Sequence, residues 1–246
     1  MELFDIAGLK VAMNCRDKED GLLRQRSRAY LAENQSEAPD FSLDMPDDAL
    51  KTYAEKYNSL NLDECHYVFM GEAFYTKLLK FDGLMLHASC IEKDGMAYLF
   101  SAKSGVGKST HTDLWIKTFD NVRMINDDKP AIRYMNGRFY ACGTPFSGKH
   151  DKSINCSVPI RAIIFIERAK ENRIERLTPD KAIPLFLSQT VRPVNAEYMS
   201  LVLELLDRIL REIPIYKLYC NISREAALTA YNGINDNLKE VDGNEN

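Results

Sequence analysis

One run of eight residues has the types and spacing that bind phosphate: Ala102-Lys103-Ser104-Gly105-Val106-Gly107-Lys108-Ser109. It follows an apolar stretch at 97–100 and precedes a segment at 110–119 that we expect to be helical. A strand, a glycine-rich turn, Lys-Ser and a helix together form the arrangement that binds nucleotide phosphates. Gly105 and Gly107 let successive backbone N–H groups point at an anion, and the helix adds the positive end of its dipole.

The predicted phosphate contacts fall on consecutive residues of this run and on the position after it. They are Ser104, Gly105, Val106, Gly107, Lys108, Ser109 and Thr110. Lys108 would reach the outer phosphates, and the Ser109 hydroxyl would ligate Mg²⁺. Ala102 stands where this pattern usually has its first glycine, but the two glycines nearest the phosphates are kept. We therefore expect a working site for the phosphate chain of a nucleotide.

Two adjacent acids, Asp127 and Asp128, follow Lys108 by about twenty residues and come after an apolar strand segment at 122–125. In phosphate-loop enzymes an acid at the end of a neighbouring strand completes the Mg²⁺ site. Two acids allow divided roles, in which one holds the metal and the other accepts a proton from an attacking hydroxyl. The alternative is a pair of turn acids that cap the next element. The sequence at 126–129 does not match the Asn-Lys-x-Asp motif that reads guanine, so no guanine preference is indicated.

Two further candidates lie outside these motifs. His87 belongs to a segment, 84–91, that we expect to form a strand beside the one that precedes the phosphate loop. Its ring would then hydrogen-bond an active-site acid and tune the pKa of that acid; the alternative is an ordinary structural histidine. Lys149 lies in a loop, 143–152, with two glycines, a proline and several cations. Its ammonium would stabilise charge that builds on a transferred phosphoryl group; the alternative is an ordinary surface loop.

The elements that must position these residues follow a mixed α/β pattern. Asp94-Gly95 and Asn136-Gly137 each join two strand-like segments through a tight hairpin turn. A strongly apolar run at 160–166 predicts a central buried strand. Because hairpins interrupt the alternation of strands and helices, we expect a mixed sheet rather than a purely parallel, doubly wound one.

The chain divides into three regions by composition. Residues 1–80 predict a small N-terminal α+β region, and 84–235 predict the α/β domain that carries the phosphate loop. Residues 236–246 are polar and predict a disordered tail.

The overall composition excludes several classes of partner. The chain has 246 residues and a net charge of −4, which gives no reason to expect binding to nucleic acid or to an anionic membrane. No stretch approaches the roughly 18 to 20 apolar residues that a membrane helix needs. The first residues are acidic and lack the layout of a signal peptide, so we expect a cytoplasmic protein.

Together these motifs resemble the HPr kinase/phosphorylase family. Its members have a strand with Leu-His, a short hairpin, a loop that ends Ser-Gly-Val-Gly-Lys-Ser, and an Asp-Asp about twenty residues later. The matching positions here are Leu86-His87, 104–109 and Asp127-Asp128. The same core resembles the nucleotide-binding half of ATP-dependent phosphoenolpyruvate carboxykinase. The resemblance spans roughly 84–232 and implies an α/β fold with a P-loop core of this HPr kinase and carboxykinase type.

The resemblance also implies a chemistry. It implies ATP and Mg²⁺, with Asp127 as the base for a serine hydroxyl, Asp128 as a metal ligand beside Ser109, and His87 as a partner of the acid. It hints at a homo-oligomer. The segment that reads the protein substrate in the family has no counterpart here, so HPr itself is not the expected acceptor.

The leading interpretation is an ATP-dependent kinase. It would transfer the γ-phosphoryl group to a hydroxyl acceptor, which is a serine of a peptide or protein or a small molecule. One alternative is a nucleotide-binding regulatory module without transfer chemistry, in which the N-terminal region binds a partner. Another is a carboxykinase-like lyase.

Overall fold

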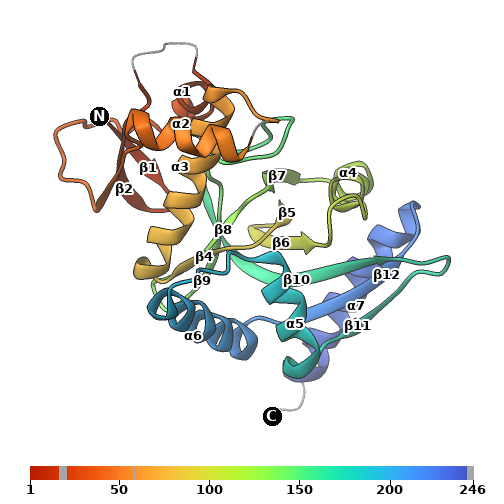
Figure 1. Cartoon of the computed structure of the whole chain (residues 1–246). Helices are drawn as coiled ribbons and strands as arrows, with labels where there is room; N and C mark the ends of the chain where they lie inside the picture. Colours follow the sequence, from red (N-terminus) through yellow and green to blue (C-terminus); the bar gives the residue numbers. More distant parts are fainter. Residues whose placement is uncertain (17–20, 58, 243–246) are drawn as a thin grey trace.

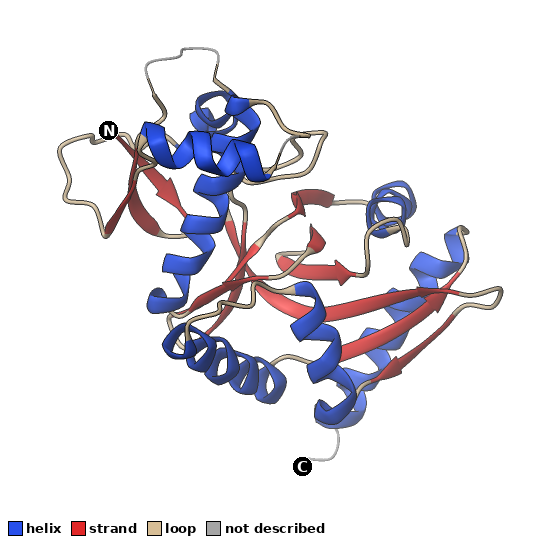
Figure 2. Cartoon of the chain, viewed as in Figure 1, coloured by secondary structure: helices blue, strands red, loops and turns tan. Residues whose placement is uncertain are grey.

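The computed structural model describes residues 1–16, 21–57 and 59–242, with 237–242 described by their backbone alone. The elements, in chain order, are β1 (Glu2–Ile6), β2 (Leu9–Met13), α1 (Leu22–Ser27), the 3₁₀ helix η1 (Arg28–Tyr30), β3 (Phe41–Leu43), α2 (Asp47–Lys56), α3 (Leu62–Leu78), the 3₁₀ helix η2 (Leu79–Phe81), β4 (Gly83–Met85), β5 (Ala88–Lys93), β6 (Met96–Ser101), α4 (Lys108–Thr118), β7 (Val122–Asp128), β8 (Ala131–Met135), β9 (Arg138–Cys142), β10 (Ser157–Arg168), β11 (Arg173–Arg176), α5 (Pro179–Gln189), α6 (Ala196–Glu212), β12 (Ile215–Cys220) and α7 (Arg224–Asp242). Figure 1 shows the N-terminal elements gathered at one end of the molecule, and Figure 2 shows the mix of helices and strands.

The fold is mixed α/β, as the hairpin pattern predicted. A small sheet has the order β1-β2-β3, and the larger one has the order β4-β8-β9-β10-β6-β5-β7, with β12 beside β10 and β11 beside β12. The long strand β10 joins two parts of the larger sheet. Its first residues pair antiparallel with β9, and later residues pair parallel with β6 and β12. The strand before the phosphate loop, β6, therefore lies beside the long strand β10.

Both predicted hairpin turns are confirmed. Asp94 and Gly95 join β5 to β6 with φ of 52° and 76°, and Asn136 and Gly137 join β8 to β9 with φ of 51° and 81°. Positive φ at both central residues is the turn geometry that matches the twist of antiparallel strands. The first hairpin places the β5 strand, which begins after His87, against the strand that feeds the phosphate loop.

Helices cover both faces of the sheet around β10. Ile163 and Phe165 pack in a core with α5 and α6, whereas Ile164 and Ile166 pack in a core with α4 and α7. This alternation is the period-two pattern of a strand that is buried on both faces. Helices α4 and α5 therefore lie on opposite faces of β10.

The N-terminal region shares a core with the domain that follows it. Phe74 of α3 and Phe146 have ring centroids 5.5 Å apart, and both belong to a buried cluster that also includes Ala131 and Cys142. This packing fixes the segment around Phe146, which leads to the loop that contains Lys149. Within the described ranges, no helix is both long and apolar enough to cross a bilayer.

One expectation about local structure was wrong. The segment 84–91 is not one strand: β4 pairs with β8, β5 pairs with β6 and β7, and the two residues between them face the end of α5. The chain changes partners there because His87 N–H bonds to the Gln189 carbonyl at 2.7 Å. Of the segment 236–246, the structure describes 236–242 as the last residues of α7. Residues 243–246 lie outside the described residues.

Candidate functional site

The phosphate loop has the backbone that its glycines predict. Gly105 and Gly107 have φ of 79° and 121°, values that other residues rarely adopt, and α4 begins at Lys108. The residue that precedes the helix is Gly107, which has no side chain to cap the first N–H groups of α4. These N–H groups and the positive end of the helix dipole therefore remain available to an anion.

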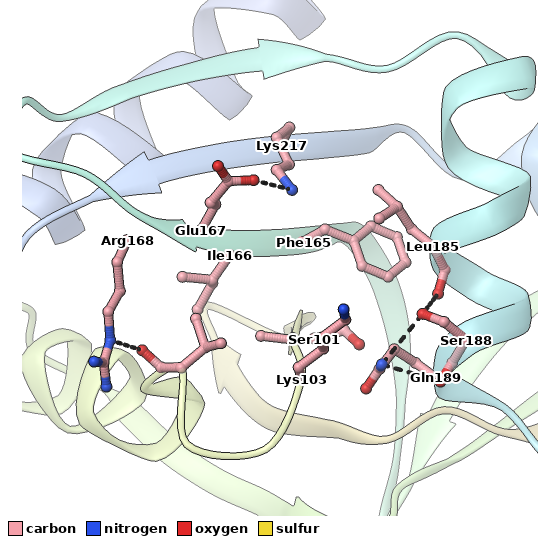
Figure 3. Close-up of a pocket in the computed structure, with 12 residues that line it drawn as sticks. Ser101, Lys103, Phe165, Ile166, Glu167, Arg168, Leu185, Ser188, Gln189 and Lys217 are labelled. Atoms are coloured by element: carbon pink, nitrogen blue, oxygen red, sulfur yellow. Dashed lines mark hydrogen bonds and ion pairs between the residues drawn. The ribbon is translucent and has the colours of Figure 1, made fainter.

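Arg168, at the end of β10, holds the loop from outside. Its Nε donates to the Val106 carbonyl at 2.9 Å, and its Nη2 donates to the Gly105 carbonyl. Figure 3 shows this side chain reaching the loop from the neighbouring strand. These two hydrogen bonds tie the carbonyl groups of the loop to the end of β10. No motif in the sequence marks this residue; its only signal is its place after a strongly apolar strand segment.

Lys108 is buried at the base of the loop, with 9% of its surface exposed. Its Nζ lies 3.0 Å from His87 Nε2 and 3.4 Å from the Ala102 carbonyl. Burial lowers the pKa of Lys108, and the nearby Asp128 and Asp127 oppose this effect. The ammonium is thus largely buried with two carboxylates nearby that favour its charged form, which suits a group that must contact phosphate.

Asp128 lies between His87 and Lys129. Its Oδ1 lies 2.9 Å from His87 Nε2, and its Oδ2 lies 2.6 Å from Lys129 Nζ. Burial acts to raise the pKa of Asp128, but the hydrogen bond from His87 and the charge of Lys129 outweigh it and hold that pKa well below its usual range. Asp128 also has φ of 105°, a strained backbone of the kind that concentrates at functional sites.

Asp127 turns to the opposite side, toward the start of α4. Its Oδ1 accepts hydrogen bonds from Ser89 at 2.7 Å and from Ser109 at 3.1 Å. The carboxylate is buried, with 8% exposure, so these hydroxyls supply the hydrogen bonds that a buried acid requires. The two neighbouring acids thus have different surroundings, one among hydroxyls and the other among cations.

His87 is oriented by Gln189, which the sequence analysis did not single out. His87 Nδ1 lies 3.0 Å from Gln189 Oε1, and Gln189 Nε2 donates to the Ser188 carbonyl at 3.0 Å. Because the Gln189 amide group is fixed in this way, Nδ1 carries a proton and donates it to Oε1. Nε2 then lies within hydrogen-bond distance of both Lys108 Nζ and Asp128 Oδ1. It has a single site, so it accepts from Lys108 when it is unprotonated and donates to Asp128 when it is protonated.

The structure brings the loop with Lys149 close to the acids, but Lys149 itself lies outside the contacts described above. Gly148 N–H donates to the Asp127 carbonyl at 2.7 Å, and Asp127 N–H donates to the Lys152 carbonyl at 2.9 Å. Lys149 follows in an exposed turn. Within the described residues, the chain of charged contacts therefore runs from Lys108 to Lys129 without it.

Two pockets flank the phosphate loop. The first, of about 340 Å³, lies on the α5 side and is lined by Gln189, Leu185 and the residues just before the loop's glycines. Figure 3 shows the ion pair between Glu167 and Lys217 at one side of this pocket, and the two atoms lie 2.9 Å apart. The second, of about 430 Å³, lies between the start of α4 and the ends of β10 and β12. Arg168 borders both pockets.

A protein-family model described as SynChlorMet cassette protein ScmC matches residues 56–226, which is more than half of the chain. The chain belongs to this family. The matched range contains the phosphate loop, both acids, His87 and Gln189. No curated protein matches the chain. Among solved structures, the HPr(Ser) kinase/phosphatase from Coxiella burnetii is similar over 65% of this chain and 94% of that one, at 11% identity and a TM-score of 0.39.

Proposed function

We propose that this ScmC-family chain is an ATP-dependent phosphotransferase that moves the γ-phosphoryl group to a hydroxyl acceptor. One observation carries the proposal: a continuous chain of contacts runs from Lys108 through His87 and Asp128 to Lys129, directly beside an uncapped helix start. A buried ammonium at the first residue of α4 and a strained, ionised carboxylate thus lie on opposite sides of one histidine, beside N–H groups that can bind an anion. Phosphoryl transfer needs this combination of positioning and charge stabilisation.

The residues present fit both the nucleotide and Mg²⁺. The N–H groups of the loop and of the first turn of α4 would hold the phosphate chain, and Lys108 would reach its outer end. Ser109 and Asp127, 3.1 Å apart, offer a hydroxyl and a carboxylate oxygen, which are ligands that Mg²⁺ prefers. When bound, Mg²⁺ would neutralise charge on the phosphates.

The surroundings of the two acids favour an allocation of roles opposite to the one that the family resemblance implied. Asp127 accepts from Ser109, the predicted Mg²⁺ ligand, so we assign Asp127 to the metal side. Asp128 is less buried and lies beside His87 and Lys129, so we assign it to the acceptor side. There the acceptor O–H proton passes to the Asp128 carboxylate while the oxygen bonds to the γ-phosphorus. The bond from that phosphorus to the bridging oxygen breaks, and its electron pair leaves on ADP.

The test follows ³²P from [γ-³²P]ATP, with Mg²⁺, into a panel of hydroxyl acceptors. The panel contains peptides with serine, threonine or tyrosine and small alcohols. Lys108→Ala should reduce transfer at least about 100-fold, because it removes the cation at the phosphates. Lys117→Ala, on the exposed end of the same helix, is the matched control and should leave transfer unchanged. Equal transfer by both variants would contradict the proposal, and ATP binding without transfer to any acceptor would favour the regulatory module.

A further inference from the structure

We infer that the nucleobase binds in the pocket between the start of α4 and the ends of β10 and β12, and not in the pocket on the α5 side. This inference rests on the proposed function, because it concerns the nucleoside end of the same ligand. It names the part of the molecule that would select a nucleoside triphosphate over another polyphosphate.

The pocket is continuous with the phosphate loop. Gly107 and Thr110, from the loop and from the first turn of α4, line one end of it. A phosphate chain held by the N–H groups of that turn would therefore leave its nucleoside end directly in this pocket. Ala169 and Asn221, which follow β10 and β12, line the other end. The volume of about 430 Å³ lies in the usual range for small-molecule sites.

The walls suit a flat apolar ring. Leu114 of α4 faces Ile166 and Cys220, which lie at the ends of β10 and β12. Ile222, at the rim, is 77% exposed, which is a high value for a large apolar side chain next to a pocket. A base that enters the pocket would cover part of this apolar surface and gain the free energy of its burial.

His111 supplies an independent sign of a missing ligand. It lines the pocket and is only 3% exposed. Its Nε2 accepts a hydrogen bond from Trp115 Nε1 at 3.0 Å, whereas its Nδ1 is buried without a hydrogen-bond partner. Burial lowers the pKa of His111 to about 4, so the ring is neutral and Nδ1 carries the proton. A buried donor without a partner is costly, and a ring nitrogen of a nucleobase is an acceptor that would satisfy it.

The pocket on the α5 side fits the base less well. Its residues from the end of β6 and from the loop are Ser101, Ala102, Lys103 and Val106, and none of its lining residues belongs to α4, whose first turn would hold the phosphates. The ion pair between Glu167 and Lys217 occupies its wall. Burying this pair under an apolar ring would cost desolvation energy.

The experiment compares the binding of ATP and of inorganic tripolyphosphate, each with Mg²⁺, by calorimetry. The wild-type chain should bind ATP at least about tenfold more tightly, because tripolyphosphate lacks the base. Ala169→Trp fills the inferred base pocket and should abolish this advantage while leaving the tripolyphosphate affinity within about twofold. Leu185→Trp, which fills the pocket on the α5 side, is the matched control and should change neither affinity.

A second readout uses NMR of ¹⁵N-labelled histidine. Adding ATP, but not tripolyphosphate, should shift the Nδ1 resonance of His111. The inference is overturned if Leu185→Trp removes the advantage of ATP and Ala169→Trp does not, or if the wild-type chain binds both probes equally. Failure to bind either probe would instead contradict the proposed function itself, so the two failures are distinguishable.

Discussion

Asp128→Asn perturbs the residue at which the contacts of the site converge. Asn tolerates positive φ about as well as Asp, so the backbone at φ of 105° is kept and only the charge is lost. The substitution weakens the contact of 2.9 Å with His87 and that of 2.6 Å with Lys129. A hydrogen bond to a charged group contributes about 1.5–3 kcal/mol. The Lys129 side chain is 39% exposed, so its ion pair adds at most about 1 kcal/mol.

Because the amide keeps a neutral acceptor, we expect Asp128→Asn to lower the free energy of unfolding by about 1–3 kcal/mol at pH 7. This difference should depend on pH. Although burial acts to raise the pKa of Asp128, His87 and Lys129 hold it below that of an unfolded aspartate. Such a group stabilises the fold above its unfolded pKa of about 4, and this stabilisation is lost as pH falls toward the folded pKa. At pH 3.5 the difference should be about 0.7 kcal/mol smaller than at pH 7.

The assay is urea unfolding at pH 7, 4 and 3.5, followed by the fluorescence of the buried Trp115. Asp207→Asn is the matched control, because Asp207 pairs with Arg211 on the exposed face of α6. It should change stability by less than about 0.5 kcal/mol at every pH. A difference between Asp128→Asn and the wild type that is the same at pH 7 and 3.5, or an Asp128→Asn variant as stable as the wild type, would refute the reasoning.

Three further predictions concern other parts of the site and its frame. Gln189→Leu should leave His87 Nδ1 without its acceptor and shift the balance of His87 tautomers in ¹⁵N NMR spectra, whereas unchanged spectra would show that Gln189 does not orient the ring. Asp127→Asn should raise the Mg²⁺ concentration needed for half-maximal ATP binding at least about tenfold. An unchanged Mg²⁺ concentration would show that Asp127 is not a metal ligand. Gly143→Ala should lower the free energy of unfolding, measured in urea, by about 3 kcal/mol or more, because a Cβ there would lie 1.8 Å from the Ile154 carbonyl oxygen. A stability close to that of the wild type would show that the backbone relaxes.

The local features of the site could be predicted from the sequence because they depend on neighbouring residues. The phosphate loop is a continuous run whose glycines fix its backbone. The two hairpin turns follow from Asp94-Gly95 and Asn136-Gly137 in the same way. For the loop and the two turns, local sequence was sufficient because few tertiary contacts were needed to decide the outcome. A contact between His87 and an active-site acid was also expected, and His87 lies 2.9 Å from Asp128 because β5, which begins after His87, pairs with β7, which ends at Asp128.

Features that depend on distant contacts could not be predicted. Gln189 contacts His87 across 102 positions of the chain, and Arg168 contacts Val106 across 62, so neither has a signal in a local pattern. The break of the expected strand at 84–91 has the same origin, because the end of α5 takes the place of a strand partner there. By contrast, the start of α3 at Leu62 had a readable signal in the capping box formed by Asn61 and Glu64.

The most direct test of the central claim is a crystal structure with Mg²⁺ and a non-hydrolysable ATP analogue. The account predicts outer phosphates on the loop N–H groups and on Lys108, Mg²⁺ beside Ser109 and Asp127, and Asp128 facing the terminal phosphate. An analogue bound elsewhere, with Lys108 still on His87 and the loop N–H groups without an anion, would contradict it.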